Sequence, residues 1–379
     1  MRKDRELHER LVERGVPPDH MRLLLDQGVT ASTVRDALTQ IARRADAGST
    51  LLFYYAGHGM RDGEGKPFFA AYDTGDDLDS TAISLEEVAT LLKTNFRGSR
   101  VLLMADCCYS GSLRNVARAL SEAGIQTVSL TSADASNVST ANWTFTQSVI
   151  DALRGDPLLD RNHDGTITIG EVDQEVADAM KYRERQRHGY FAHGVLAKVA
   201  WSKATPSPTL TQGPHSRGAY LEAKVDGRWQ TVRVVEPGAA QSVVRLYDYC
   251  ESKDRRVPSS SLREIGFKHY PVGAEIRVYW GGKIWPAEVT GFEDDFHKIT
   301  YPGWPAYWDE WVLSNRIAAD DESGTAGEKV GEKVDVEWQG SWYPAVVMKR
   351  SGDRALIHYE GYASSWDEWV GPQRMRPRR

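Results

Sequence analysis

Two short stretches decide the fold of the first half of the chain: Leu51-Leu-Phe-Tyr-Tyr-Ala-Gly-His58-Gly59 and Val101-Leu-Leu-Met-Ala-Asp106-Cys107-Cys108-Tyr109-Ser110-Gly111. Each begins as an apolar run of strand length and ends in polar residues. Continuous apolar runs are typical of strands that are buried on both faces of a parallel sheet. Functional groups in such sheets collect beyond the carboxyl ends of the strands. The two stretches therefore predict a His and a Cys at strand ends.

Helical and strand patterns alternate around these stretches up to about residue 200. We expect strands at 51–56, 100–105 and 127–130. We expect helices at 7–13, 31–45, 85–94, 115–123, 145–153 and 171–185. Such alternation predicts an α/β sandwich of three layers with a mostly parallel sheet over residues 1–200.

Length and composition bound the class of protein. With 379 residues, the chain exceeds the ~250–300 residues at which single cores stop growing, so it should hold several domains. The net charge of −6 argues against a general nucleic-acid binder, and three cysteines are too few for a disulfide framework. No run approaches the ~18 apolar residues of a spanning helix, and the charged start is not a signal sequence. These features predict a cytoplasmic protein that does not enter a membrane.

A repeat organises the second half of the chain, beyond a Ser/Thr/Pro/Gly-rich linker at 203–218. Trp308-Asp-Glu-Trp311-Val returns as Trp366-Asp-Glu-Trp369-Val, at an offset of 366 − 308 = 58 residues. Val272-Gly, Trp280, Pro286-Ala and Tyr301 recur at the same offset as Val330-Gly, Trp338, Pro344-Ala and Tyr359. Short strands and glycine turns predict small closed β-barrels at 270–318 and 328–377, joined by the acidic segment 318–327. A degenerate copy is expected at 219–266.

The His and the Cys form a pair that is suited to acyl transfer. Cysteine attacks as a thiolate, and a nearby histidine lowers its pKa and protonates the leaving amine. We therefore interpret Cys108 as the nucleophile and His58 as the general acid/base, with the backbone amides of Gly59 and Cys108 as oxyanion donors. The alternative is that His58 caps a loop and that both cysteines are buried at strand ends.

The motifs Tyr54-Tyr-Ala-Gly-His58-Gly and Asp106-Cys-Cys108-Tyr-Ser-Gly111 resemble the two signatures of the caspase-like superfamily, in its metacaspase and bacterial branch. The resemblance extends to about residue 195 and implies a caspase-like fold and a cysteine endopeptidase. By position it implies that His58 and Cys108 are the catalytic pair and that Cys107 is a bystander. The family opens with a central strand, whereas this chain begins at its first helix, so we expect that strand to be missing.

The resemblance also implies a substrate preference. Metacaspase-like enzymes carry an Asp two residues before the nucleophile and cleave after Arg or Lys, and this chain has Asp106 there. A carboxylate facing the substrate would pair with arginine and repel an acidic side chain. Asp4 is the candidate for a second carboxylate of the pocket. A helix N-cap is the alternative role for Asp4.

A twelve-residue segment at 160–171 has the spacing of an EF-hand calcium loop. Oxygen ligands fall at Asp160, Asn162 and Asp164, a backbone carbonyl at Thr166 and a bidentate carboxylate at Glu171, with glycine at the sixth position. We therefore expect calcium as a cofactor, and no organic cofactor. An Asx-rich turn between two helices is the alternative.

The segment Ile357-His-Tyr359-Glu-Gly-Tyr362-Ala-Ser-Ser-Trp366-Asp-Glu-Trp369-Val resembles chromo-barrel and Tudor-knot domains, which are SH3-like barrels of chromatin readers. The resemblance implies aromatic cages that hold a methylated or quaternary ammonium group. By position these are Trp285, Tyr301, Trp304 and Trp308 in one barrel, and Tyr343, Tyr359, Tyr362 and Trp366 in the next. The alternative is that these aromatics fill the barrel cores, the role we expect for Trp311 and Trp369.

The sequence thus favours a caspase-like cysteine endopeptidase that cleaves after Arg or Lys and responds to calcium. Its protein or peptide substrate meets the first domain, while the barrels recognise a protein partner or a cationic ligand. The main alternative is an inactive pseudoprotease scaffold that acts through its barrels. RNA is the disfavoured ligand, because acidic residues outnumber basic residues in the second barrel.

Overall fold

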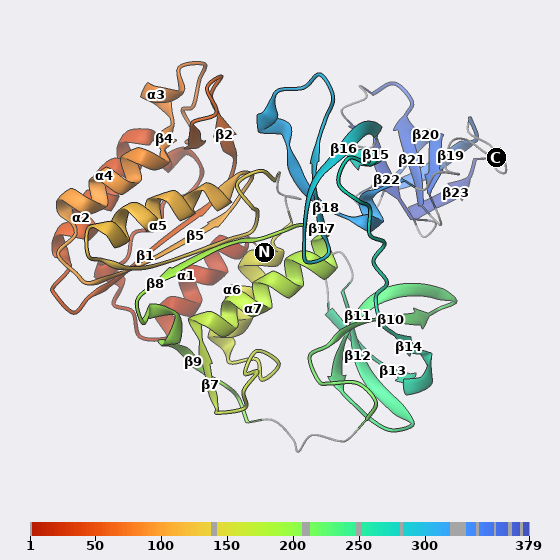
Figure 1. Ribbon diagram of the computed structural model, residues 1–379, viewed down its shortest axis with the longest axis horizontal. Coiled ribbons are helices and arrows are strands. Elements are labelled where there is room, and N and C mark those ends of the chain that lie inside the picture. Colours follow the sequence, from red (N-terminus) through yellow and green to blue (C-terminus); the bar gives the residue numbers. More distant parts are fainter. Residues whose placement is uncertain are drawn as a thin grey trace.

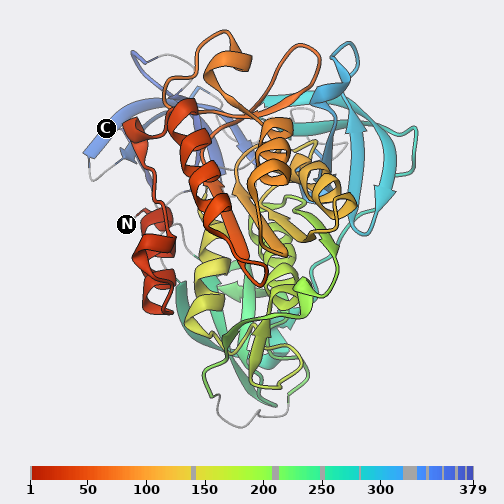
Figure 2. The same cartoon turned by 90° about the vertical axis from the view of Figure 1, so that its left-hand side faces the viewer.

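A computed structural model describes residues 2–137, 142–206, 213–247, 252–280, 283–318, 331–338, 341–351, 354–362, 366–371 and 374–378. Nearly all of the acidic segment 318–327 and part of the linker at 203–218 lie outside the described residues. Figure 1 shows an α/β domain beside three small β-structures. In Figures 1 and 2 the first of these lies at the lower end of the molecule and the other two at the upper end.

The central sheet has the strand order β1(Thr50–Ala56)–β5(Arg100–Asp106)–β6(Gln126–Thr131)–β8(Gly189–His193). The first three strands are parallel and β8 is antiparallel. This arrangement confirms the predicted, mostly parallel sheet. The strand ends at Ala56 and Asp106 lie in register, so both chain segments leave the sheet at the same edge.

Two hydrophobic clusters cover the two faces of the sheet, because successive side chains of a strand point to opposite faces. Leu103 belongs to the cluster of α2(Ala31–Arg44), α4(Leu85–Asn95) and α5(Leu113–Glu122). Leu102 and Met104 belong to the cluster of α1(Lys3–Glu13), α6(Thr144–Arg154) and α7(Ile169–Ala179). Figure 1 shows these helices as layers on either side of the strands, which confirms the three-layer sandwich. The remaining short elements are β2(Gly59–Arg61), β3(Pro67–Phe69), α3(Leu78–Thr81), β4(Ile83–Ser84), β7(Thr166–Thr168) and β9(Ala200–Lys203).

The two strands that carry the motifs differ in burial. β5 is buried from Val101 to Asp106, as its apolar run predicts. In β1 only Leu51 is fully buried, and residues 52–56 are half-buried. The expectation that both strands are buried on both faces is therefore wrong for β1. The reason is its position: in the described part of the chain β1 pairs with β5 alone, so it forms an edge of the sheet.

Three antiparallel sheets follow, and their all-β character confirms the predicted fold class of the second half. The first contains β10(Tyr220–Val225), β11(Arg228–Glu236), β12(Gln241–Tyr247), β13(Ser252–Pro258) and β14(Leu262–Arg263). The second contains β15(Glu275–Trp280), β16(Lys283–Glu293), β17(Phe296–Thr300) and β18(Glu310–Leu313). The third contains β19(Lys333–Trp338), β20(Ser341–Ser351), β21(Arg354–Tyr359), β22(Glu368–Val370) and β23(Met375–Pro377). Each encloses its own small core, and we call them the first, second and third barrels.

The first barrel is held against α7 by a buried ion pair. Arg233 of β11 is 3% exposed and lies 2.6 Å from Glu175 of α7. The Arg233 side chain also donates to the carbonyl oxygen of Leu158, at 3.2 Å. A buried charge needs such a partner, so this contact attaches the first barrel to the α/β domain. Among the described residues, every helix falls short of the length and apolar character that a membrane-spanning helix needs.

Candidate functional site

His58 and Cys108 follow two neighbouring parallel strands at the same distance. Ala56 of β1 pairs with Asp106 of β5, and each motif residue lies two positions beyond its strand. Past the strands, the segments stay in contact, because a Cβ atom at Gly59 would overlap the carbonyl oxygen of Cys108. Only glycine fits there. The structure thus brings the His58-Gly59 segment directly against Cys108.

The loop that carries His58 is held by its backbone. The Tyr55 hydroxyl donates to the carbonyl oxygens of His58 and Ala70, at 3.0 and 2.8 Å. The amide of Ala70 also donates to the His58 carbonyl, at 2.9 Å. The His58 backbone is therefore fixed, while its side chain is exposed to solvent.

The two adjacent cysteines occupy different environments. Cys107 is 1% exposed, and burial raises the pKa of its thiol well above the ordinary value, with the Asp106 carboxylate adding to the rise. Cys108 is half-buried at the start of the turn that leads to α5. A thiol reacts as its thiolate, so Cys107 is poorly suited to be a nucleophile and Cys108 is the better placed of the two.

Asp106 ends β5 with its carboxylate buried at 9% exposure. The amide and the hydroxyl of Thr146 donate to its Oδ2, at 3.3 and 2.6 Å. Burial raises the pKa of Asp106 to about 6, although the Thr146 hydrogen bonds oppose the rise. Sequence reasoning assigned Thr146 no role at this carboxylate, because nothing local links the start of α6 to the end of β5.

The second predicted carboxylate lies near the first. Asp106 and Asp4 both raise the pKa of the Tyr54 hydroxyl, in addition to the larger effect of burial, which places all three groups in one neighbourhood. Asp4 is buried in the first turn of α1 and lies 2.5 Å from the Arg2 guanidinium. The N-cap residue of α1 is Arg2, so the alternative role of Asp4 as a helix cap is wrong.

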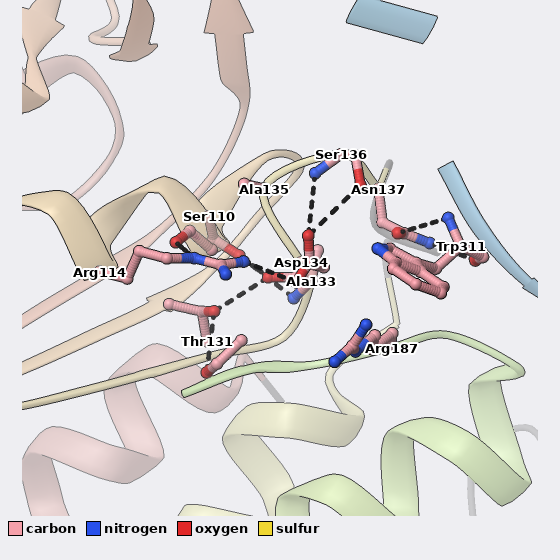
Figure 3. A network of polar contacts seen from close by, with 12 residues as sticks. Ser110, Arg114, Thr131, Ala133, Asp134, Ala135, Ser136, Asn137, Arg187 and Trp311 are labelled. Atoms are coloured by element: carbon pink, nitrogen blue, oxygen red, sulfur yellow. Dashed lines mark hydrogen bonds and ion pairs between the residues drawn. The ribbon is translucent and has the colours of Figure 1, made fainter. Parts of the chain in front are cut away.

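The loop at 134–137 contacts the second barrel through the side chain of Asn137 (Figure 3). The carbonyl of Asn137 accepts from the Tyr109 amide at 2.9 Å. The Asn137 amide side chain meets the backbone of Trp311 in β18, donating to its carbonyl at 2.9 Å and accepting from its N–H at 3.2 Å. The Arg187 guanidinium lies over the Trp311 ring, 4.5 Å from its centroid. The expectation that Trp311 packs in a barrel core is therefore wrong, because its ring and backbone serve the contact between domains.

Trp369 at the equivalent position is also outside its barrel core. Its ring stacks edge to face on Tyr279 of the second barrel, with centroids 6.3 Å apart. Both tryptophans are half-buried and neither belongs to the cluster of apolar side chains that fills its barrel. The second and third barrels thus each use the last Trp of the Trp-Asp-Glu-Trp motif to contact another domain, the α/β domain for Trp311 and the second barrel for Trp369.

All eight residues expected in the aromatic cages line two pockets. The pocket of the second barrel is lined by Trp285, Tyr301, Trp304 and Trp308, together with Trp280, Tyr307, Glu310, Tyr109 and Ser136. The pocket of the third is lined by Tyr343, Tyr359, Tyr362 and Trp366, together with Trp338, Asp367 and Glu368. Trp280 and Trp338 were not among the expected cage residues, although the repeat pairs them at the offset of 58 residues.

Each pocket has a tyrosine with a buried hydroxyl at its base. Tyr301 donates to Glu310 at 2.6 Å, and Glu310 lies 2.7 Å from Arg316. In the third barrel Tyr359, Glu368 and Arg374 repeat this chain of contacts. Because the carboxylate accepts from both neighbours, it fixes the ring of the tyrosine at the wall of the pocket.

Family models match two regions of the chain. A family model described as Caspase domain matches residues 5–221, which is more than half of the chain. The chain belongs to the caspase-domain family. A second model, described as Agenet domain, matches residues 331–379, which contain the third barrel.

Solved structures match less than half of the chain. The four MBT repeats of Drosophila melanogaster Sfmbt, in complex with the peptide RHR(me)KVLR, share 12% identity with a TM-score of 0.21, over 44% of this chain and 64% of that chain. The tandem Agenet domain 3-4 of ADCP1 shares 16% identity with a TM-score of 0.14, over 43% and 79% of the two chains. The AGD34 region of Arabidopsis thaliana AGDP1 gives the same identity and TM-score, over 43% and 82%. Among curated proteins, none matched the chain.

The EF-hand-like loop lies within the caspase domain. Asp160 accepts from the amides of Asp164 and Gly165, at 3.1 and 2.9 Å, and Gly165 has the left-handed φ of +83° that the tight turn requires. Glu171 accepts from the amide of Thr168 at 2.9 Å, as the capping box of α7. Side chains of His, Cys, Asp and Glu do not converge in a group of three for a metal ion anywhere in the described ranges.

The two helices do not flank this loop equally. α7 follows directly, whereas α6 ends at Arg154, well before Asp160. The short strand β7 inside the loop pairs with β9 of the same domain. The loop therefore joins α6 to α7 as a part of the caspase domain and does not form a separate helix pair.

Proposed function

We propose that this chain is a cysteine endopeptidase in which Cys108 is the nucleophile and His58 the general acid/base. The observation that supports this role most directly is the contact of Gly59 with Cys108 beyond two paired strands. The Cys108 Sγ attacks the peptide carbonyl carbon, and His58 passes the thiol proton to the leaving amine as the C–N bond breaks. Water then hydrolyses the thioester and restores the thiol. The amides of Gly59 and Cys108 would hold the oxyanion.

The first test uses the two adjacent cysteines as a matched pair. Cys108→Ala should abolish cleavage of peptides that end in arginine, whereas Cys107→Ala, which removes a buried thiol, should retain the activity of the folded protein. Peptides that end in aspartate should remain uncut by both. If the unaltered protein cleaved neither class of peptide, the enzymatic proposal would be wrong.

We assign substrate preference to Asp106 and Asp4, which would pair with the arginine or lysine on the amino side of the cleaved bond. The pKa of Asp106 is raised to about 6, so its carboxylate loses the charge that attracts a cation as the pH falls through 6. A bound guanidinium would favour the ionised form. The preference for arginine should therefore be strong above pH 6 and weak below it.

A ratio of two substrates isolates this effect. Citrulline has the shape of arginine without its charge, so the ratio of kcat/KM for Arg and citrulline peptides cancels the titration of the catalytic pair. We expect the ratio to fall by roughly tenfold per pH unit below 6. Asp106→Asn should lower it by about 10- to 100-fold at pH 7.5 and remove its pH dependence. A ratio that stays constant between pH 5 and 8 in the unaltered protein would contradict the role of Asp106.

We also propose that the loop at 160–171 binds calcium. Asp160, Asn162 and Asp164 place three oxygen-bearing side chains around the turn at Gly165, which is the donor chemistry that calcium prefers. Glu171 would have to leave its capping contact with Thr168 to become a ligand. Calorimetry should detect calcium binding to the unaltered chain and none to Asp160→Ala with Glu171→Ala. Unchanged binding in this double variant would exclude the loop as the site, whatever the peptidase activity.

The barrels would recruit a protein partner through a methylated or quaternary ammonium group. Rings from four or more aromatic residues face each pocket, and such faces attract cations that are too bulky to be hydrated well. Peptides with trimethyllysine should bind more tightly than the same peptides with unmodified lysine. An equal affinity for both would contradict this assignment.

A second candidate function is an inactive scaffold that binds through its barrels. The observation in its favour is the edge position of β1, whose half-buried residues support the His58 loop from one side only. Alkylation distinguishes the two functions, because an activated Cys108 should react with iodoacetamide far faster than glutathione does at pH 7. A rate no greater than that of glutathione would favour the scaffold.

A further inference from the structure

The pocket of the second barrel is shared with the caspase domain. Tyr109 and Ser136 contribute to its wall, opposite the aromatic rings of the barrel. Tyr109 is the residue that follows Cys108. The pKa of its hydroxyl is raised mainly by burial, and Cys108, Tyr307 and Glu310 all contribute, so the phenol lies near both domains at once. The pocket of the third barrel is lined by its own residues, among those the structure describes.

The backbone around Tyr109 is constrained on both sides. Its φ of +55° is left-handed, a conformation that costs energy for any residue with a Cβ atom. The Tyr109 amide donates to Asn137, whose side chain binds Trp311 of the barrel. The ring lies 4.8 Å from the guanidinium of Arg61, in the strand that begins with Gly59. Tyr109 thus touches the pocket, the barrel contact and the strand that follows His58.

Ser136 is fixed by the same loop. Its amide and hydroxyl donate to Asp134, both at 3.3 Å, and Asp134 lies 2.6 Å from Arg114 of α5 (Figure 3). Arg114 lies in α5, which begins shortly after Cys108. One network of polar contacts therefore joins Ser136 in the wall of the pocket to the helix that follows the cysteine. The cavity has a volume of about 10 Å³, against about 280 Å³ in the third barrel, so its walls must move apart to admit an ammonium group.

We propose that this composite pocket is a regulatory site for a methylated or quaternary ammonium group, and that its occupation changes the reactivity of Cys108. The proposal rests on the proposed function of Cys108 as nucleophile. A cation in the pocket contacts the Tyr109 ring and therefore favours one position of the turn that carries the thiol. Coupling between two sites is reciprocal, so a change at Tyr109 must also alter the affinity for the cation.

The first experiment measures binding without catalysis. Tetramethylammonium chloride is titrated against the full chain carrying Tyr362→Ala, which disables the third barrel, with sodium chloride as the control for ionic strength. Adding Tyr109→Ala should weaken binding by about three- to tenfold, because one cation–π wall is lost, whereas Tyr109→Phe should retain the affinity. An unchanged affinity in the Tyr109→Ala variant, or no binding at all in the parent, would overturn the composite site.

The second experiment measures the coupling. The rate of alkylation at Cys108 by iodoacetamide is followed by mass spectrometry, with and without saturating tetramethylammonium. We expect a change of at least threefold that is lost in Trp304→Ala and kept in Tyr362→Ala, the matched residue of the third barrel (304 + 58 = 362). Both side chains are exposed, at 40% and 47%, so neither change should unfold its barrel.

The outcomes separate the two proposals. If the probe binds the second barrel and the alkylation rate stays within 1.5-fold, the regulatory inference fails while the peptidase proposal stands. If Cys108 reacts no faster than glutathione, the peptidase proposal fails, and with it the regulation of a nucleophile, while the titration still decides whether Tyr109 completes the pocket. A rate change that depends on Tyr362 and not on Trp304 would place the effect in the wrong barrel and overturn the inference.

Discussion

The second and third barrels repeat one sequence pattern, yet the structure places them in different surroundings. Both have an aromatic pocket, a Tyr–Glu–Arg chain of contacts and a half-buried final tryptophan. Trp311 of the second barrel packs on Arg187 of the caspase domain, whereas Trp369 of the third packs on Tyr279 of the second. Trp366 of the third pocket is 52% exposed, whereas its counterpart Trp308 is half-buried. The same module therefore lines a narrow pocket of about 10 Å³ beside the cysteine turn, or a wider one of about 280 Å³ in the third barrel.

This difference teaches that position along the array decides what a barrel contacts. The motif supplies an aromatic docking side chain in each copy, and a neighbouring domain supplies the surface that it meets. Only the second barrel meets the loop at 134–137, because it alone binds Asn137 among the described contacts. We expect the following substitutions to affect the two barrels unequally.

The largest difference is expected between Glu310→Ala and Glu368→Ala. Glu310 is 5% exposed, and its removal leaves the half-buried Arg316 guanidinium without a counter-charge, with only the Tyr279 carbonyl as a partner, which should cost about 3–5 kcal/mol of barrel stability. Glu368 and Arg374 are about one-third exposed, so water replaces the lost contact and the cost should be about 1 kcal/mol or less. Amide hydrogen exchange of β17 and β21 measures both barrels in one protein. Equal losses of protection would break the comparison.

An intermediate effect is expected for Asn137→Ala. It removes both hydrogen bonds to the Trp311 backbone, which should weaken the docking of the second barrel by about 1–3 kcal/mol. Exchange should increase in β18 and in the loop at 134–137, and the third barrel should keep its protection. Asn142→Ala is a matched control, because Asn142 is exposed and bonds only to Glu184 among the described side chains. Similar exchange in the two variants would show that Asn137 does not hold the barrel.

The smallest effect is expected for Trp311→Ala and Trp369→Ala. Loss of the contact with Arg187 should loosen the second barrel by about 0.5–2 kcal/mol, while both barrels stay folded because neither ring lies in a core. Trp311→Ala should increase exchange near Arg187, and Trp369→Ala should do so only near Tyr279. If either barrel unfolded after its own substitution, its tryptophan would be a core residue and the docking role would be wrong.

Much of this architecture could be predicted locally. The apolar runs at 51–56 and 100–105 predicted β1 and β5, and helical periodicity predicted the helices within a few residues at each end. The offset of 58 residues predicted two copies of one barrel, and the resemblance to chromo-barrel domains pointed to the aromatic residues that line their pockets. Burial of β1 was predicted wrongly, since a residue pattern shows that a strand is apolar but not how many neighbours it has. Trp311 and Trp369 were misassigned for a related reason, because a core tryptophan and a docking tryptophan look alike in sequence.

The candidate site divides in the same way. His58, Cys108 and Asp106 were recognisable because each ends an apolar run in a chemically distinctive motif. Thr146 at Asp106, Asn137 at Trp311 and Tyr109 in the pocket gave no such signal. Their roles depend on contacts between segments that are far apart in the chain, and no local pattern encodes such a contact.

By itself, the sequence determined the family of the first half, the repeat of the barrels and the chemistry available at each motif, because periodicity and motif spacing are properties of neighbouring residues. Only the tertiary structure decided that β1 lies at an edge, that Cys107 is buried beside a half-buried Cys108, and that Tyr109 closes the pocket of the second barrel. These outcomes follow from which surfaces pack together, and packing is settled by the whole folded chain.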